Sequence, residues 1–213
     1  MLHPEEDLYE TPESSRRTGS YYADAPYMEV VIAEKVSFMK KIGLPFTAFR
    51  GAFFGLTDDL AAVLKKVGLQ IDLSSAPGIA RPERMADWTD APSTAYYMSP
   101  RSYRRAVDQP EKGDIFEIPL GWDEKGIELS HNYLFHERST YTRMCKVWDA
   151  IVERSAKAER PQFVNFLCHT YSMGNARLRT QCQQILNYMQ EHHGVPVTAS
   201  EAKQAYDNLF FKA

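Results

Sequence analysis

Apolar residues recur at helical spacing in several stretches of the chain, and residues that start or stop helices flank them. Gly43 follows the first stretch and suits the left-handed conformation that ends helices. Thr57 is predicted to cap the second helix, and Ser200 is predicted to cap the last one through Glu201. The predicted helices cover residues 26–42, 57–68, 140–157, 177–192 and the chain from residue 200 onward.

Short runs of β-branched and aromatic residues between these helices predict strands. They cover residues 46–50, 69–73, 96–98, 115–118, 163–167 and 195–198. The run at 163–167 is apolar except for Asn165, which is typical of a central strand. Helix, strand, helix and strand follow one another through short connections, which predicts an α/β domain with parallel strands. Residues 74–114 are rich in proline and aromatic residues and are predicted to be irregular and functional.

Composition narrows the class of protein. The chain has 213 residues, of which 44% are apolar and 25% charged, enough for one domain with a sizeable core, or at most two small ones. Residues 1–25 are polar and rich in turn formers, so we expect a loop there and the α/β domain over residues 26–213. A net charge of −3 argues against a nucleic-acid partner.

Targeting signals and cysteines bear on the compartment. The sequence has neither a signal peptide at its start nor an apolar run of the roughly 20 residues that a membrane helix needs. We therefore expect no membrane partner and, by default, a cytoplasmic location. Cys145, Cys168 and Cys182 show no metal-binding spacing, and their odd number fits either a reducing compartment or one disulfide and a free thiol.

Side chains able to do chemistry stand at the carboxyl ends of four predicted strands. These are Arg50, Asp72, Trp122 and His169. In open or barrel-like α/β folds, the carboxyl ends of parallel strands gather at one site. Among these side chains, a histidine is best suited to act as a general acid or base near neutral pH. A structural, hydrogen-bonded histidine is the alternative for His169.

The other strand-end residues also have structural alternatives. For Arg50, the alternative is an ion pair with Asp72 at the rim of the sheet. Asp72 can instead cap the turn that contains Ser74 and Ser75. Cys168 precedes His169, but neighbouring residues of a strand point to opposite faces, so the two are poorly placed as a catalytic pair.

The order of these segments resembles the polysaccharide deacetylase family, the carbohydrate esterases with a NodB-type domain. Phe49-Arg50-Gly-Ala-Phe-Phe-Gly55 resembles the family's third motif, and Phe166-Leu167-Cys168-His169 resembles its fifth. Other matching segments are Leu2-His3-Pro4-Glu5, which resembles the end of the second motif, the stretch at 68–78, Glu117-Ile-Pro119, and the tail at 184–203.

The resemblance implies a NodB-type distorted (β/α) barrel that is incomplete at its N-terminus, because the family's first motif, Thr-Phe-Asp-Asp, does not occur in this chain. It implies metal-dependent hydrolysis of N- or O-acetyl groups on a carbohydrate, with zinc as the expected metal. Of the family's metal-binding histidines in the second motif, only His3 is present.

The same resemblance implies roles for individual residues. His169 corresponds to the general acid, and Arg50 corresponds to the residue that orients a catalytic aspartate. Asp72, Trp122 and Tyr171 are expected to support the site or bind substrate. Because the metal site is incomplete, the alternative is a non-catalytic, truncated or degenerate domain that binds a glycan or a partner chain.

Overall fold

The computed structural model describes residues 20–44, 46–125 and 132–211. It forms two compact units. The first comprises the chain up to Ala91 together with Tyr96–Glu117, and the second comprises Pro92–Ala95 and the chain from Ile118 onward. Residues 20–23, which we expected in a loop, are helical.

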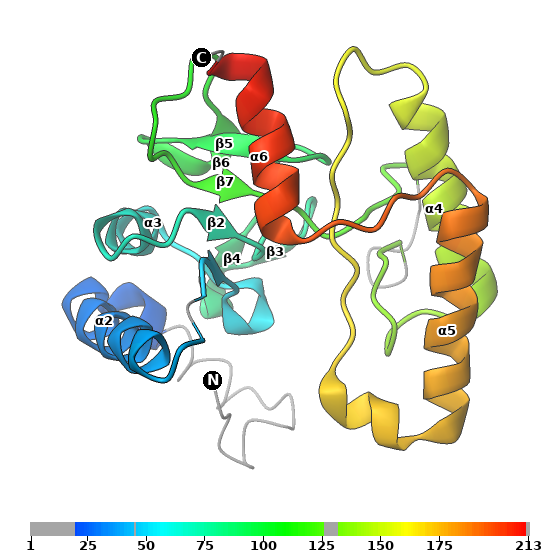
Figure 1. The fold of residues 1–213 in the computed structure, drawn as a ribbon, viewed down its shortest axis with the longest axis horizontal. Helices are drawn as coiled ribbons and strands as arrows, with labels where there is room; N and C mark the ends of the chain where they lie inside the picture. Colours follow the sequence, from blue (N-terminus) through cyan, green and yellow to red (C-terminus); the bar gives the residue numbers. More distant parts are fainter. Residues whose placement is uncertain (1–19, 45, 126–131, 212–213) are drawn as a thin grey trace. The chain divides into compact units, whose positions relative to one another are not determined.

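A mixed five-stranded sheet forms the centre of the first unit (Figure 1). Its strands, in spatial order, are β1 (Ala48–Phe49), β2 (Ile71–Asp72), β7 (Phe116–Glu117), β5 (Tyr96–Ser99) and β6 (Ser102–Ala106). The first three are parallel, as the sequence predicted, whereas β5 runs antiparallel to both β7 and β6. The described strands thus make an open sheet in a mixed α/β architecture and do not close into a barrel.

The register of the three parallel strands places their last residues side by side. Phe49 pairs with Asp72, and Asp72 pairs with Glu117. The carboxyl ends of β1, β2 and β7 therefore meet at one edge of the sheet, where α/β folds place polar side chains for function.

Helix α3 (Asp58–Lys66) confirms the local prediction made for it. The Thr57 hydroxyl accepts a hydrogen bond from Leu60 N at 3.0 Å, and Asp58 and Asp59 occupy the positive first turn. The helix buries Leu60, Val63 and Leu64 in the core of this unit.

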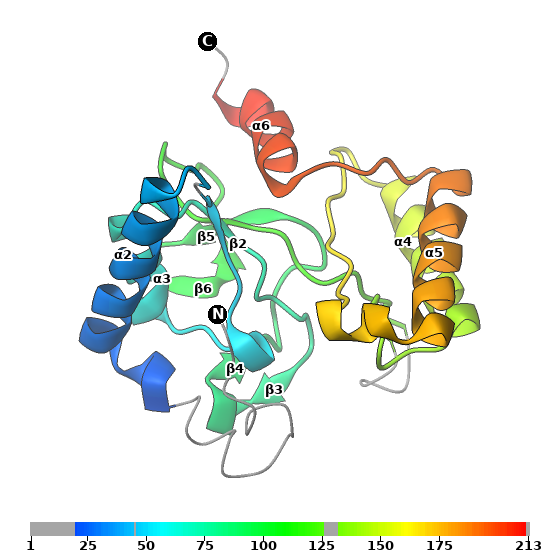
Figure 2. The ribbon, with the colours of Figure 1, turned by 60° about the horizontal axis from the view of Figure 1, so that its bottom comes forward.

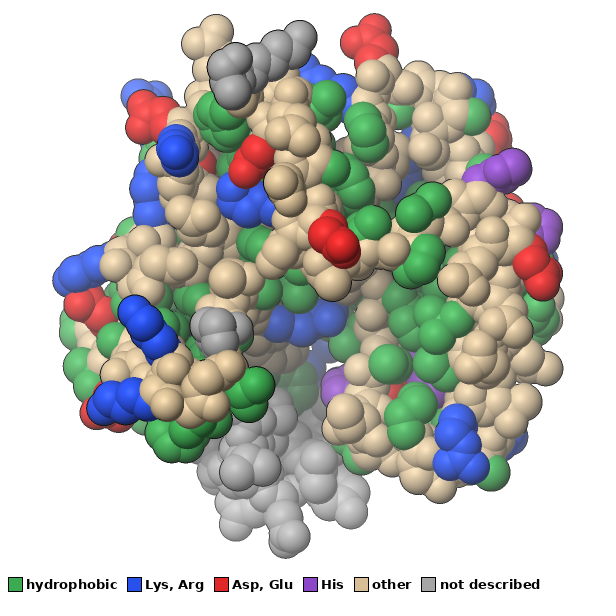
Figure 3. All heavy atoms as spheres, in the orientation of Figure 1, with side chains coloured by type: hydrophobic (Ala, Val, Ile, Leu, Met, Phe, Trp, Pro, Cys, Tyr) green, Lys and Arg blue, Asp and Glu red, His purple; other side chains and the backbone are tan. Residues whose placement is uncertain are grey.

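Helix α2 (Ala25–Lys41) packs against α3 through a narrow face (Figures 1 and 2). Its buried residues are Met28 and Ile32, four positions apart, because one stripe of the helix faces α3. The apolar residues Val30, Phe38 and Ile42 are 58%, 57% and 51% exposed. Hydrophobic side chains accordingly appear on the surface at α2 (Figure 3).

The stretch at 74–114 is more regular than its composition predicted. Strands β3 (Ala80–Arg81) and β4 (Ala86–Asp87) form an antiparallel pair around the short helix η3 (Pro82–Arg84). Trp88 follows β4, is fully buried, and donates its indole N–H to the carbonyl oxygen of Phe54 at 2.7 Å. This stretch therefore contributes core to the first unit as well as loops.

Helices α4 (Tyr141–Ser155) and α5 (Ala176–Glu191) pack together in the second unit (Figure 1). Thr140 caps α4 through the Arg143 amide, and Asn175 caps α5. Their shared core contains Leu134, Met144, Val147, Ile151, Ile185 and Met189. Both helices were predicted from their apolar spacing, because spacing and caps are local properties of the chain.

The strand predictions for this unit were wrong. Residues 163–167 form only isolated parallel bridges, Leu120 to Asn165 and Phe135 to Leu167, instead of a central strand. Residues 195–198 form no strand, and they lead into helix α6 (Ala199–Phe210).

The cap of α6 also differs from the expected one. Thr198 caps this helix in place of Ser200 and forms a reciprocal capping box with Glu201. Thr198 is three residues before Glu201, which is the spacing that a capping box needs and that Ser200 does not have. None of the helices described is both long enough and apolar enough to cross a membrane.

Candidate functional site

The parallel bridge between Phe135 and Leu167 brings two polar residues together in the second unit. His136 N donates to Leu167 O at 2.9 Å, and Leu167 N donates to Leu134 O at 2.9 Å. Glu137 lies two residues after Phe135, and His169 lies two residues after Leu167. Side chains two positions apart on extended segments share a face, so the bridge sets these two beside each other.

Glu137 is held by three contacts from the segment that follows the bridge. Its Oε1 accepts hydrogen bonds from the His169 amide, at 2.7 Å, and from the Ser172 hydroxyl. Its Oε2 lies 3.3 Å from Nδ1 of His169. The side chain of Glu137 is 13% exposed and that of His169 is 39% exposed, so the histidine faces solvent over a carboxylate that is mostly buried.

These contacts decide the charge of Glu137. Burial would raise the pKa of the carboxyl group, but the hydrogen bonds from His169 and Ser172 outweigh it and lower the pKa to about 2. Glu137 is therefore ionised at neutral pH and faces Nδ1 of His169. Nε2, on the opposite side of the imidazole ring, remains as the nitrogen that can exchange a proton with a bound molecule.

Two aromatic rings flank His169. Tyr171 stacks on the imidazole with ring centroids 4.9 Å apart and an interplanar angle of 21°, and Phe135 lies at 5.8 Å. Tyr171 belongs to the short helix η5 (Thr170–Gly174) and is 64% exposed. The structure thus brings together two of the residues that the sequence singled out, His169 and Tyr171.

The neighbouring histidine, His136, has a structural role. It is fully buried, and its Nε2 lies 2.8 Å from the carbonyl oxygen of Leu178 in α5. The Gln181 amide donates to the backbone oxygen of His136 at 3.2 Å. These contacts fix the segment that carries Glu137 onto helix α5.

Trp122 packs within the second unit. It forms an isolated bridge with Tyr133, and the two rings stack at 6.3 Å with an interplanar angle of 15°. Its carbonyl oxygen accepts a hydrogen bond from Arg154 at 3.2 Å. Trp122 therefore supports the fold of this unit.

Asp72 belongs to the first unit, where it faces Glu117 across β2 and β7. Both side chains are completely buried. Asp72 accepts hydrogen bonds from the Ser74 hydroxyl at 2.7 Å and the Ser74 amide at 3.2 Å, which confirms that it caps this turn. The Ser75 amide bonds instead to Glu117, at 3.0 Å.

Arg50 follows β1 in the same unit. Its guanidinium carbon lies 5.9 Å from the centre of the Phe54 ring, and its charge favours the ionised form of Glu117. Phe53 and Phe54, in the same loop, have φ angles of 54° and 68°, a left-handed conformation that is unusual for bulky residues. The Arg50 loop thus combines a cation with backbone strain beside two buried carboxyl groups.

A metal site does not emerge from the residues that the structure covers. Across 20–44, 46–125 and 132–211, no three His, Cys, Asp or Glu residues are grouped so that they could hold a metal ion. The predicted ligand His3 lies outside the described residues. The described residues therefore do not fit a zinc centre, which needs at least three protein ligands.

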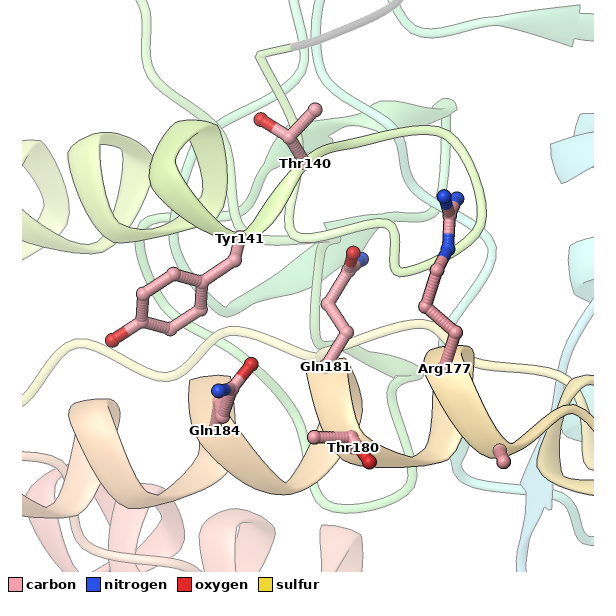
Figure 4. Close-up of a pocket in the computed structure, with 7 residues that line it drawn as sticks. Thr140, Tyr141, Arg177, Thr180, Gln181 and Gln184 are labelled. Carbon is pink, nitrogen blue, oxygen red and sulfur yellow. The ribbon is translucent and has the colours of Figure 1, made fainter.

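A shallow depression of about 520 Å³ lies between the starts of α4 and α5. Arg177, Gln181 and Gln184 rise from α5 toward Thr140 and Tyr141 at the start of α4 (Figure 4). Its described lining includes no carboxylate, histidine or thiol, so it lacks the groups for acid–base chemistry at neutral pH.

Sequence reasoning did not assign Glu137, Ser172 or Glu117 to a site. Glu117 carries a usable signal, since it is a lone acid in the apolar run Ile115–Ile118. Glu137 and Ser172 carry none, because the bridge that joins their segments spans residues 32 positions apart. Comparisons of the chain with family models, curated proteins and solved structures found no match.

Proposed function

We propose that this chain is a polysaccharide deacetylase-like protein that hydrolyses N- or O-acetyl groups on a carbohydrate. The observation that carries the proposal is the contact between Glu137 and His169. A carboxylate beside Nδ1 orients the imidazole ring and leaves Nε2 as the nitrogen that can meet a substrate. His169 then protonates the leaving amine or alcohol as the acetyl group is cleaved.

The exposed ring of Tyr171 supports a carbohydrate substrate. Flat aromatic side chains offer apolar surface with a polar edge, which suits the faces of sugar rings. Stacked on His169, Tyr171 would hold a sugar ring within reach of Nε2. Trp122 would support this unit from within, through its contact with Tyr133.

In the first unit, we propose that Arg50 and Asp72 are supporting residues at the ends of strands, as in a NodB-type fold. The open parallel strands β1, β2 and β7 agree with part of such a (β/α) barrel. Asp72 accepts a hydrogen bond from the Ser74 hydroxyl, and the positive charge of Arg50 favours the ionised form of the buried Glu117.

The resemblance also suggests a divalent metal, zinc, with His3 as one ligand. Because the described residues supply no group able to hold such an ion, we assign no chemical step to it. Elemental analysis of the purified protein tests this point directly. One zinc per chain, lost in His3→Ala, would support the metal-dependent reaction.

A non-catalytic glycan-binding protein is the second candidate. The observation that favours it is the exposed Tyr171 next to a site without metal ligands among the described residues. In that case Tyr171 would matter for binding, and the proton-transfer capacity of His169 would not be used.

The test measures acetate released from acetylated chitin oligosaccharides and acetylated xylan. We expect His169→Gln to lower kcat by about 10²- to 10⁴-fold, the usual contribution of a general acid. Tyr171→Ala should instead raise KM, because the stacking surface is lost. His192→Gln, at the exposed end of α5, is the matched control and should leave both constants unchanged.

Binding of the same oligosaccharides, measured by calorimetry, separates the two candidates. Binding that is lost in Tyr171→Ala, without acetate release by the unmodified protein, would favour the glycan-binding alternative. Acetate release that is unaffected by His169→Gln would overturn the role given to His169. Absence of both release and binding would overturn the carbohydrate proposal as a whole.

A further inference from the structure

Two cysteines lie next to each other beside His169 in the second unit. Cys168 follows the bridge residue Leu167 and is exposed, whereas Cys182 lies on α5 and is buried. The residues that precede them, Leu167 and Gln181, both hydrogen-bond to the backbone of His136, and Cys168 is close enough to Cys182 to contribute to its raised pKa.

The fold accounts for this proximity. The bridge holds Leu167 against His136, and His136 Nε2 contacts the backbone of Leu178 at 2.8 Å. Cys182 is four residues after Leu178, on the same face of α5. The segment that carries Cys168 and the face of α5 that carries Cys182 are thus fixed to the same residue.

We propose that Cys168 and Cys182 form a reversible intramolecular disulfide by exchange with a low-molecular-weight disulfide such as glutathione disulfide. The exposed thiol is the one that an oxidant reaches first, and the buried thiol stands in contact to resolve the product. The inference does not depend on the proposed function, although the bond would form one residue before His169.

The exchange proceeds in two steps that balance. The Cys168 thiolate attacks one sulfur of glutathione disulfide, whose sulfur–sulfur bond breaks, and one glutathione thiolate leaves. The Cys182 thiolate then attacks the Cys168 sulfur and displaces the second glutathione. Two cysteine thiols lose two electrons and two protons in all, and the glutathione disulfide takes them up as two thiols.

The local environment sets the order of these steps. Burial, together with the neighbouring Cys168 and Glu137, raises the pKa of the Cys182 thiol, so Cys182 is a poor first nucleophile. Cys145 lies on α4, one turn after Tyr141. Cys145 is therefore the internal control for a cysteine with a different neighbour.

The experiment treats the full chain with glutathione disulfide, blocks the remaining thiols with an alkylating agent and maps tryptic peptides by mass spectrometry. Arg177 and Arg179 lie between the two cysteines, so trypsin separates them unless a disulfide joins them. We expect the joined peptides from the unmodified protein and from Cys145→Ser. Dithiothreitol should restore both thiols.

The variants define the order of events. Cys182→Ala should accumulate glutathione on Cys168, and Cys168→Ser should give neither the joined peptides nor the glutathione adduct at Cys182. Far-UV circular dichroism verifies that each variant is folded, and the result with the unmodified protein stands without them.

Other outcomes overturn the proposal. These are stable glutathione on Cys168 of the unmodified protein without an internal bond, a disulfide that involves Cys145, joined peptides found only in covalent dimers, or two thiols that react only after unfolding in urea.

Discussion

Asp72 and Glu117 end neighbouring parallel strands, pair directly in register, and place two carboxyl groups against each other with no exposure to solvent. Among the described residues, Oε2 of Glu117 has no hydrogen-bond partner. Two ionised carboxylates this close and this deeply buried would repel each other, so we expect the pair to hold one proton in the folded protein.

This proton makes stability depend on pH. Burial and the neighbouring charge of Asp72 raise the pKa of Glu117 well above its ordinary value of 4.5, and burial also raises the pKa of Asp72. A carboxyl group whose pKa is higher in the folded than in the unfolded protein stabilises the folded state fully below its unfolded pKa. This contribution is lost as the pH rises through the folded pKa. We expect the free energy of unfolding to fall between about pH 5 and about pH 8 for this reason.

Glu117→Gln should flatten this decline, because the amide cannot ionise and its oxygen can still accept from Ser75 N. Urea unfolding at both pH values measures the effect. Glu34→Gln, at an exposed position of α2, is the control and should keep the pH dependence of the unmodified protein. An unchanged decline in Glu117→Gln would show that the pair holds no shared proton.

Glu137 should change the pH dependence of the free energy of unfolding in the opposite direction, at acidic pH. Its pKa, lowered to about 2, means that its contribution is present above the ordinary value of 4.5 and is lost as pH falls toward about 2. We expect Glu137→Gln to lower the free energy of unfolding at neutral pH by about 1–2 kcal/mol, reduced by solvent screening of the partly exposed site. Acid titration followed by circular dichroism should show a smaller loss of stability in this variant.

Ser172→Ala provides the matching comparison for that site. It removes one donor to Glu137 and keeps the charge, so part of the acid sensitivity should remain. If Glu137→Gln titrates like the unmodified protein, the carboxylate is not held as described.

Gly55→Ala should destabilise the first unit through a close approach. A Cβ at this position would lie 2.4 Å from a Tyr22 ring carbon and 2.7 Å from the carbonyl oxygen of Arg84. Because the Arg84 atom belongs to the backbone, we expect a loss of about 3 kcal/mol or more in unfolding free energy. Gly43→Ala, where φ is 75° and space is open, should cost only about 1 kcal/mol. Equal losses in the two variants would contradict the tight packing at Gly55.

The capping box of α6 gives a test of local structure. Thr198→Ala removes the hydroxyl that accepts from Glu201 N at 3.2 Å, and should cost about 1 kcal/mol. Ser200→Ala, two residues on, should change stability by less than about 0.5 kcal/mol. Thermal unfolding of the two variants compares them directly, and the reverse ranking would restore the cap that the sequence first suggested.

The sequence by itself determined the features that depend on neighbouring residues. Helix α3 and its Thr57 cap appeared as predicted, since caps and apolar spacing act within one or two turns. The parallel arrangement of β1 and β2 was also predictable, because a helix connects them in the usual crossover.

Contacts between distant residues were decided only by the tertiary structure. The mostly apolar run at 163–167 was predicted to be a central strand, yet it pairs only at single residues, with Leu120 and Phe135. Hydrophobicity reports that a segment is buried, and it does not report which segment pairs with it.

The two acid sites show the same division most clearly. The sequence marked Asp72 and His169 as candidates, because each ends or follows a predicted strand. Their partners, Glu117 and Glu137, lie 45 and 32 residues away along the chain. Strand register and one parallel bridge brought them within contact, and register is set by the packing of the whole unit. Residue type alone thus supplied the chemistry, and tertiary pairing decided which groups share a proton or a charge.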